Sequence, residues 1–217
     1  MQAGAIGPPA FAVPGTIPDG LQLWIVRHGE TEWSRDGRHT GRTDLPLTAR
    51  GEAQARAVAQ VLAGIAPVLV LSSPMSRARE TARLAGLHPA AIDDDLREWD
   101  YGDYEGRTST EIQVEAPGWS LWTSGAPGGE TPTEVAERAD RVLRRSVESL
   151  PTGPVVLVAH GHISRMIAAR WIGLGPDGGA HLLLGTAAPS ILSTQYGISV
   201  IDRWNLPNPA LANGELS

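Results

Sequence analysis

Three short apolar segments, each ending at a polar cluster, constrain the fold of this chain more than any other feature. They are Leu21–Val26, Val68–Leu71 and Val155–Ala159, and their length and branched side chains are typical of strands buried on both faces. Helical patterns separate these segments, so strands and helices alternate along the chain. This alternation predicts an α/β fold, a three-layer α/β/α sandwich with a mainly parallel sheet.

Capping signals and apolar periodicity place helices between these strands. Thr48 is a typical N-cap residue, and Thr131 with Pro132 and Glu134 forms a helix-start pattern. The expected helices run from Thr48 to about Leu62, from the Arg77 region to about Leu87, from Thr131 to about Leu150 and from His162 to about Ile172. A surface loop is expected over Ser34–Leu47, and one or two further strands at Ser190–Leu192 and Ile198–Ile201.

The composition of the chain limits which class of protein it can belong to. A chain of 217 residues with 41% apolar and 19% charged residues suits one soluble domain, expected over 21–217, and contains no apolar run that could span a bilayer. Met1–Gly20 is rich in Gly, Pro and Ala and is expected to be a flexible leader. Cysteine is absent, which excludes thiolate chemistry and is compatible with the cytoplasm. The net charge of −6 argues against nucleic acid as a partner, while a homodimer is compatible with the sequence.

Cations and imidazoles follow the ends of all three predicted strands. Arg27 and His28 follow the first, Arg77 the second and His160 the third, and a parallel sheet brings these ends to one edge. A zinc site made by His28, His160 and His162 with a carboxylate is one interpretation. Two guanidinium groups would repel a dication but bind a phosphate group in a bidentate manner. The cluster therefore predicts a phosphate site without a metal or a cofactor.

The segment Asp93–Glu105 contains seven carboxylates that alternate with large side chains such as Trp99 and Tyr101. The aromatic residues should anchor the segment, so that at least one carboxylate faces inward. A carboxyl group crowded by other carboxylates holds its proton near neutral pH. The segment thus predicts a protonated acid at the phosphate site.

Four motifs in the expected order make the chain resemble the histidine phosphatase superfamily, the phosphoglycerate mutase-like proteins, over roughly Leu21–Ile201. The resemblance implies that fold and a phosphatase or mutase activity on a small phosphorylated substrate. The motifs are Arg27-His28-Gly29-Glu30-Thr31, Ser72-Ser73-Pro74 leading to Arg77-Ala78, Glu98 with Tyr101-Gly102 and Glu105-Gly106, and Val158-Ala159-His160-Gly161-His162.

The resemblance also implies a role for each matching residue. His28 is the expected nucleophile, which forms a phosphohistidine, and Glu98 is the expected proton donor, its pKa raised by Asp100 and Asp103. Arg27, Arg77 and His160 are expected to hold the phosphoryl group. The positions that match substrate contacts of the family are Ser34, Thr40, Gly41, Tyr101, Gly161 and His162.

The segment around the expected acid distinguishes between branches of the family. The mutases that the chain resembles usually carry a basic Glu-Arg-His-Tyr stretch and an insertion with paired Arg. Here the stretch reads Glu98-Trp99-Asp100-Tyr101, and no Arg lies between Arg107 and Arg138. We therefore expect a phosphomonoesterase of the acid phosphatase or sugar-phosphate phosphatase type. A cofactor-dependent phosphoglycerate mutase is the alternative, and a binding module with a dormant site is a third interpretation, although no expected role is vacant.

Overall fold

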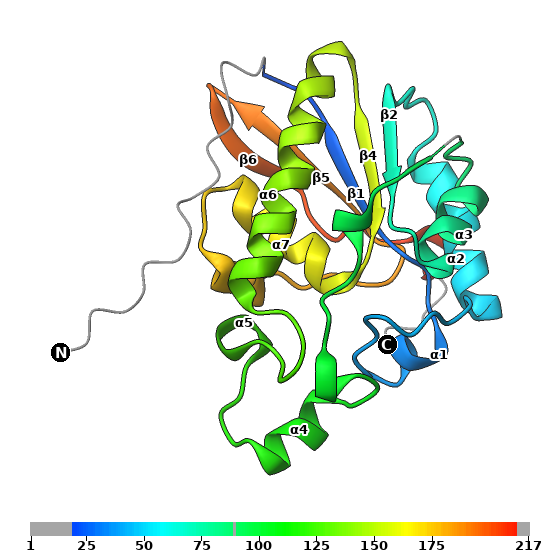
Figure 1. Cartoon of the computed structure of the whole chain (residues 1–217). Helices are drawn as coiled ribbons and strands as arrows, with labels where there is room; N and C mark the ends of the chain where they lie inside the picture. Colours follow the sequence, from blue (N-terminus) through cyan, green and yellow to red (C-terminus); the bar gives the residue numbers. More distant parts are fainter. Residues whose placement is uncertain (1–18, 89, 212–217) are drawn as a thin grey trace.

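The computed structural model describes residues 19–88 and 90–211, so the expected leader Met1–Gly20 lies outside them except for its last two residues. The described chain contains one six-stranded sheet of order β3-β2-β4-β1-β5-β6 (Figure 1). Its strands are β1 Leu23–Arg27, β2 Leu69–Ser72, β3 Ala91–Ile92, β4 Val155–Ala159, β5 Pro189–Gln195 and β6 Ile198–Arg203.

Strand direction confirms a mainly parallel sheet. β1 pairs in parallel with β4, β4 with β2, and β2 with β3. The tail, where one or two strands were predicted, contains two, β5 and β6, and both join the sheet through antiparallel pairs. Because the four parallel strands point the same way, their carboxyl ends share one edge.

Most of the connections between the strands contain helices. They are α1 Glu32–Arg35, α2 Ala49–Val61, α3 Ser76–Leu84, α4 Ser109–Glu115, α5 Leu121–Ser124, α6 Pro132–Ser149 and α7 Gly161–Trp171. Thr48 caps α2 by accepting from the backbone N–H of Gly51, and Thr131 with Glu134 forms a capping box on α6, as predicted. Helix α3 ends earlier than Leu87 because Gly86 has a φ of +75°, a left-handed conformation that terminates helices. The loop predicted over Ser34–Leu47 begins inside the short helix α1.

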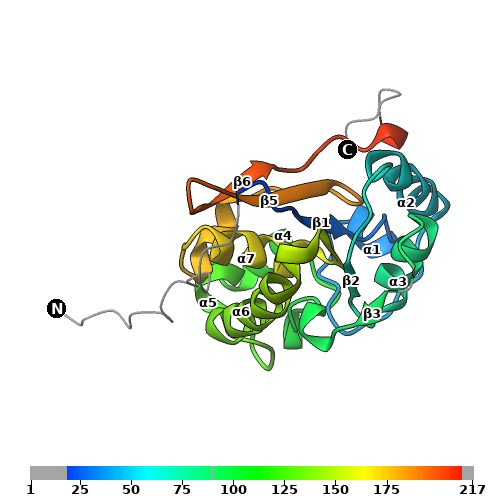
Figure 2. The same ribbon diagram turned by 90° about the horizontal axis from the view of Figure 1, so that it is seen from above.

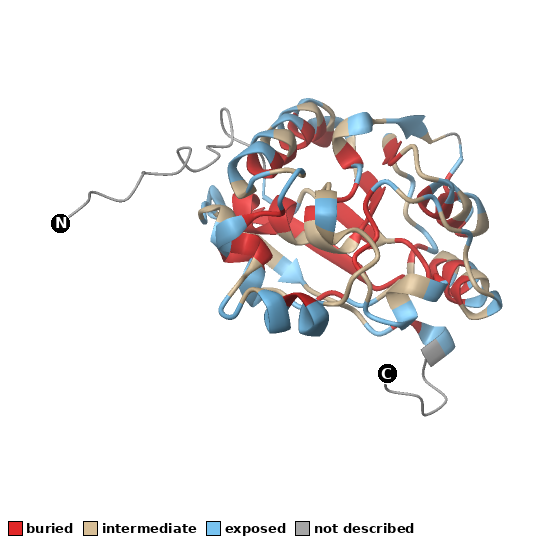
Figure 3. Ribbon diagram, turned by 60° about the horizontal axis from the view of Figure 1, so that its bottom comes forward, coloured by how far each residue is buried: buried red, intermediate tan, exposed pale blue. Residues whose placement is uncertain are grey.

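The alternation of side chains along the central strands divides the core into two parts. Leu23 and Ile25 of β1 pack in one buried cluster with residues of α6 and α7, whereas Trp24 and Val26 pack in a second cluster with α2 and α3. Figure 2 shows these helix pairs on opposite faces of the sheet, and Figure 3 shows the buried strands between them. The three-layer α/β/α sandwich is therefore confirmed.

Candidate active site

The loop after β1 is held by backbone contacts to three other segments. The N–H of His28 donates to the carbonyl of Ala159 at 2.9 Å, and the N–H of Gly29 donates to Thr81 Oγ1 at 3.0 Å. A Cβ on Gly29 would lie 2.3 Å from the carbonyl oxygen of Gly51, so the start of α2 packs directly on this loop. The side chain of His28 thus projects from a rigid support.

One ring nitrogen of His28 is committed to the backbone. Its Nδ1 lies 2.7 Å from the carbonyl oxygen of Gly29, which can only accept, so Nδ1 carries the proton. Burial, followed by the charges of Arg77 and Arg27, lowers the pKa of His28 to about 3. The ring is neutral near pH 7, and the lone pair on Nε2 is available for attack.

The predicted proximity of His28 and His160 is confirmed, with ring centroids 5.1 Å apart and planes inclined at 65°. Arg77 Nε donates to His160 Nδ1 at 3.1 Å, and His160 Nε2 lies 2.8 Å from Ser73 Oγ. Because Nδ1 accepts, the neutral ring carries its proton on Nε2. Burial and then the charge of Arg77 lower the pKa of His160 well below its ordinary range. Ser73 belongs to a motif that the sequence singled out, but its contact with His160 was not predicted.

The guanidinium of Arg77 is fully buried and organises the loop that follows α1. Nη2 donates to the carbonyls of Thr40 and Gly41 at 3.1 and 3.0 Å, and Nη1 to that of Thr43 at 2.8 Å. The N–H of Gly41 in turn donates to both carboxylate oxygens of Glu105 at 3.0 Å. Arg77 thereby connects the loop containing Thr40 and Gly41 to His160.

Arg27 retains a buried donor for which no acceptor is found in the described part of the chain. Its Nη1 donates to the carbonyl of Leu184 at 2.6 Å, whereas its Nε is buried and without a hydrogen-bond partner there. A Cβ on Gly161 would lie 3.4 Å from this Nε and 3.6 Å from Glu98 Oε2, so Gly161 borders the space between the two groups. A buried charged donor requires a partner, and a phosphoryl oxygen fits.

Glu98 binds the N-terminus of α7, the helix that follows His160. Its Oε2 accepts from the N–H of His162 at 2.9 Å, and its Oε1 accepts from that of Ile163 at 2.9 Å. Burial raises the pKa of Glu98, but hydrogen bonds and charge from His162 outweigh burial and bring that pKa well below its ordinary value. The predicted raised pKa of Glu98 is therefore wrong. Asp100 forms an ion pair with Arg42 at 2.5 Å.

Aromatic side chains lie next to Glu98. The hydroxyl of Tyr101 lies 2.7 Å from His162 Nδ1, and that nitrogen lies 3.8 Å from Glu98 Oε2. The ring of His39 stacks on Tyr101 with centroids 4.6 Å apart, and burial lowers its pKa to about 4. His39 was not among the predicted site residues, although it directly precedes Thr40, which was.

Ser34 has a different environment from the other predicted contact residues. Its hydroxyl accepts from the N–H of Thr31 at 2.8 Å and donates to the Thr31 carbonyl at 3.0 Å. The first contact, together with the donation of the Ser34 N–H to Thr31 Oγ1 at 3.2 Å, forms the capping box of α1, so the hydroxyl supports the loop after β1.

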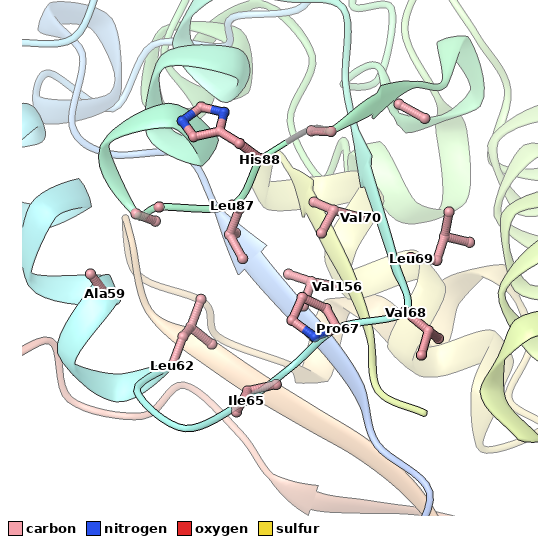
Figure 4. Close-up of a pocket in the computed structure, with 14 residues that line it drawn as sticks. Ala59, Leu62, Ile65, Pro67, Val68, Leu69, Val70, Leu87, His88 and Val156 are labelled. Carbon is pink, nitrogen blue, oxygen red and sulfur yellow. The ribbon is translucent and has the colours of Figure 1, made fainter. Parts of the chain in front are cut away.

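Two cavities differ in their relation to this cluster. One of about 730 Å³ is lined by Gly41, Arg42, Glu98 and Asp100 among others and adjoins the cluster. The other, of about 500 Å³, lies between the end of α2, the turn after α3 and β2, and its mostly apolar lining includes Leu62 and none of the predicted site residues (Figure 4). Within residues 19–88 and 90–211, no group of three His, Asp or Glu side chains could hold a metal ion, and no helix is long and apolar enough to cross a membrane.

Comparison with known proteins agrees with this geometry. A family model for the histidine phosphatase superfamily (branch 1) matches residues 23–207. The chain belongs to this superfamily. The acid phosphatase of Mycobacterium tuberculosis is 38% identical over 196 residues, which cover 88% of this chain and 97% of that protein.

Further members of the superfamily support the same branch. A glucosyl-3-phosphoglycerate phosphatase of Mycolicibacterium vanbaalenii is 37% identical over 171 residues, 72% of this chain and 76% of that protein. The solved structure of the open reading frame Rv3214 of M. tuberculosis has a TM-score of 0.85 at 38% identity, covering 87% of this chain and 99% of that one. The chain is a phosphatase, a phosphoric monoester hydrolase, rather than a mutase.

Proposed function

We propose that this phosphatase hydrolyses small phosphate monoesters through a phosphohistidine on His28. The observation that carries the proposal is the hydrogen bond of 2.7 Å between His28 Nδ1 and the Gly29 carbonyl. It fixes the neutral tautomer whose Nε2 lone pair is free for in-line attack on phosphorus. The Nε of Arg27, which has no hydrogen-bond partner among the described residues, is a donor for a phosphoryl oxygen in the same region.

In the first step His28 Nε2 bonds to phosphorus, the ester P–O bond breaks, and the leaving alkoxide takes a proton from Glu98. Glu98 is ionised in the free protein because its pKa is lowered. The negative charge of a bound phosphoryl group raises the pKa of a neighbouring carboxyl group, so substrate binding favours uptake of the required proton. Arg27 stabilises the transferring group, and Arg77 contributes positive charge and orients His160.

In the second step water attacks the phosphohistidine. Glu98, now a carboxylate, accepts a proton from that water, the P–N bond breaks, and phosphate leaves with His28 neutral again. Both steps use the same two side chains: His28 is first the nucleophile and then the leaving group, and Glu98 is first the acid and then the base. His160 carries its proton on Nε2. In the free protein this N–H donates to Ser73 Oγ, and it can donate to a phosphoryl oxygen of a bound substrate.

We propose a substrate whose alcohol carries hydroxyl groups, such as a sugar phosphate. The larger cavity is lined by six carboxylate residues and three Arg, so a second strong anion would be repelled there. The lining residues that carry charge are Arg42, Asp44, Asp94, Asp95, Arg97, Glu98, Asp100, Glu130 and Arg138. Phosphatases among the relatives, one of them named for glucosyl-3-phosphoglycerate, are consistent with such a substrate.

We further propose that no metal takes part, because Arg27 and Arg77 supply the positive charge that a metal ion would otherwise provide.

We also propose that residues 21–217 form one domain, which agrees with a family match over 23–207. A cytoplasmic location fits a sequence without cysteine. A homodimer is the assembly to test, by light scattering of the purified protein.

Trapping of the phosphoenzyme tests the mechanism. After dialysis against EDTA, the wild-type protein mixed with ³²P-labelled substrate and quenched should carry label that is labile in acid and stable in base. The His28→Ala protein should carry no label and should lose at least about 10³-fold in turnover, because the nucleophile is missing.

Three outcomes would contradict this mechanism. Label on the His28→Ala protein, or label that is stable in acid, would assign the chemistry to another residue. Loss of activity in EDTA that Mg²⁺ or Zn²⁺ restores would contradict metal independence.

A further inference from the structure

Arg138 of α6 divides its N–H groups between Glu130 and the segment that carries Glu98. Its Nε and Nη2 donate to the two carboxylate oxygens of Glu130 at 2.7 and 2.8 Å. Its Nη1 donates to the carbonyls of Asp95 and Arg97 at 2.7 and 3.1 Å, and Nη2 makes a longer contact of 3.5 Å with the carbonyl of Glu98. The guanidinium therefore contacts three backbone carbonyls within four residues of chain.

Glu130 completes this attachment on the other side of Glu98. Its Oε2 accepts from the N–H of Asp100 at 2.9 Å, and its own N–H donates to the Asp100 carbonyl at 2.9 Å. The Glu130 carbonyl accepts from the indole N–H of Trp99 at 2.9 Å. Arg138 and Glu130 thus form one unit that contacts the chain immediately before and after Glu98.

The need for this unit follows from the local structure. Residues 98–101 belong to no helix or strand, so neither a ladder nor a helical hydrogen-bond pattern fixes the backbone of Glu98. The carboxylate nevertheless has to remain in the space between α7 and Arg27. Only about 12% of the Arg138 side chain is exposed, so water screens its pairing with Glu130 weakly.

We propose that Arg138, held by Glu130, is a positioning residue for the proton donor Glu98. The inference rests on the proposed function, because it assumes that Glu98 protonates the leaving group. Arg138 also lines the cavity proposed for the alcohol of the substrate, but its N–H groups are engaged by Glu130 and by the carbonyls of 95–98, so it acts on catalysis through the position of that carboxyl group. A displacement of about 1 Å at a catalytic group can cost about 10²-fold in rate.

Lysine cannot replace this arginine. A single ammonium group has three donors and no planar fork, so it cannot hold both oxygens of Glu130 and three carbonyls together. Arg141 on the same helix provides a matched control. It also forms a bidentate pair, with the Asp95 carboxylate at 3.1 and 2.6 Å, and it has no hydrogen bond to the backbone carbonyls of 95–98 among those found.

The experiment compares Arg138→Lys, Arg141→Lys and Glu98→Gln with two substrates. Glucose 6-phosphate has an alkoxide leaving group that needs the proton, whereas the nitrophenol burst from p-nitrophenyl phosphate reports a first step that needs it little. Arg138→Lys should lower kcat for glucose 6-phosphate by about tenfold or more and the burst rate by less than about threefold. Arg141→Lys should change neither rate by more than about twofold.

A double variant separates this inference from the proposed function. If Arg138 acts through Glu98, then Arg138→Lys should add less than about twofold to the loss already caused by Glu98→Gln. Equal losses by Glu98→Gln on both substrates would instead reject the proposed acid itself. A selective loss by Glu98→Gln together with additive losses in the double variant would reject only the positioning role of Arg138.

A second variant, Glu130→Gln, tests the same inference if the Arg138→Lys protein does not fold. Glu130→Gln keeps the size of the side chain but removes the charge that holds the guanidinium. It should show the same selectivity between the two substrates with a midpoint of thermal unfolding close to that of Arg141→Lys. Loss on both substrates in equal proportion would overturn the inference.

Discussion

Gly161 illustrates how the site depends on the absence of a single methyl group. The residue begins α7 directly after His160, and its backbone has no left-handed φ that would require glycine. Any Cβ there would nevertheless enter the space between Arg27 Nε and Glu98 Oε2, at ordinary contact distances of 3.4 and 3.6 Å. Glycine therefore leaves open the space where the proposed phosphoryl group would lie, and it does not relieve backbone strain.

Gly161→Ala should fold normally and lose activity. Alanine is favoured over glycine in a helix by about 0.5–1 kcal/mol in its interior, so the midpoint of thermal unfolding should not fall. The added methyl group should keep the phosphoryl group from Arg27 and lower kcat/KM by about 10²-fold. Steady-state kinetics and calorimetry check the two effects separately, and wild-type kcat/KM in this variant would show that the phosphoryl group lies elsewhere.

A buried ion pair joins helices α6 and α7, which pack on the same face of the sheet. Arg170 of α7 is fully buried, and its Nε and Nη2 donate to the two carboxylate oxygens of Asp140 of α6, both at 2.9 Å. Since α7 begins at the catalytic edge and α6 carries Arg138, this pair fixes two elements that meet at Glu98.

Asp140→Ala should destabilise the protein by about 3–5 kcal/mol, because it leaves a buried guanidinium without its carboxylate. The exposed pair between Arg83 and Glu80 provides the control, since Glu80→Ala should cost less than about 1 kcal/mol. Urea unfolding of both variants measures the difference. Similar small losses in the two proteins would mean that the buried pair contributes little to the packing of α6 on α7.

Buried imidazoles give the whole molecule a marked sensitivity to acid. Burial lowers the pKa of His28 to about 3 and that of His39 to about 4, and it lowers the pKa of His160 as well. Below pH 6.5 the unfolded chain binds protons at these positions while the folded protein does not, so the free energy of unfolding falls as pH falls. Glu98 acts in the same direction at lower pH, because its pKa in the folded protein is also lowered.

Between pH 6.5 and pH 5 each of these histidines should reduce the free energy of unfolding by up to about 2 kcal/mol. His39→Gln should remove about one such contribution, so that urea midpoints at pH 7 and pH 5 differ less than in the wild-type protein. His88→Gln, at an exposed position, should keep the full difference. An unchanged difference in the His39→Gln protein would mean that His39 is protonated in the folded state.

Much of the secondary structure can be predicted from the sequence, because the signals that specify strands and helix ends are local. Apolar runs locate β1, β2 and β4, and the cap residues Thr48 and Thr131 locate two helices, since capping involves groups within one turn of chain. The parallel order of these strands is sufficient to bring His28 and His160 together at one edge.

The protonation states and the supports of the site depend on contacts between distant residues. Glu98 accepts from the N–H of Ile163, 65 positions later, and hydrogen bonds and charge from the neighbouring His162 hold its pKa low where the crowding of nearby carboxylates suggested a raised one. Arg77 likewise donates to His160, 83 positions away. Sequence patterns identify which groups follow which strand, but a pKa or a hydrogen bond depends on distance in space and on burial, which the packing of the layers determines.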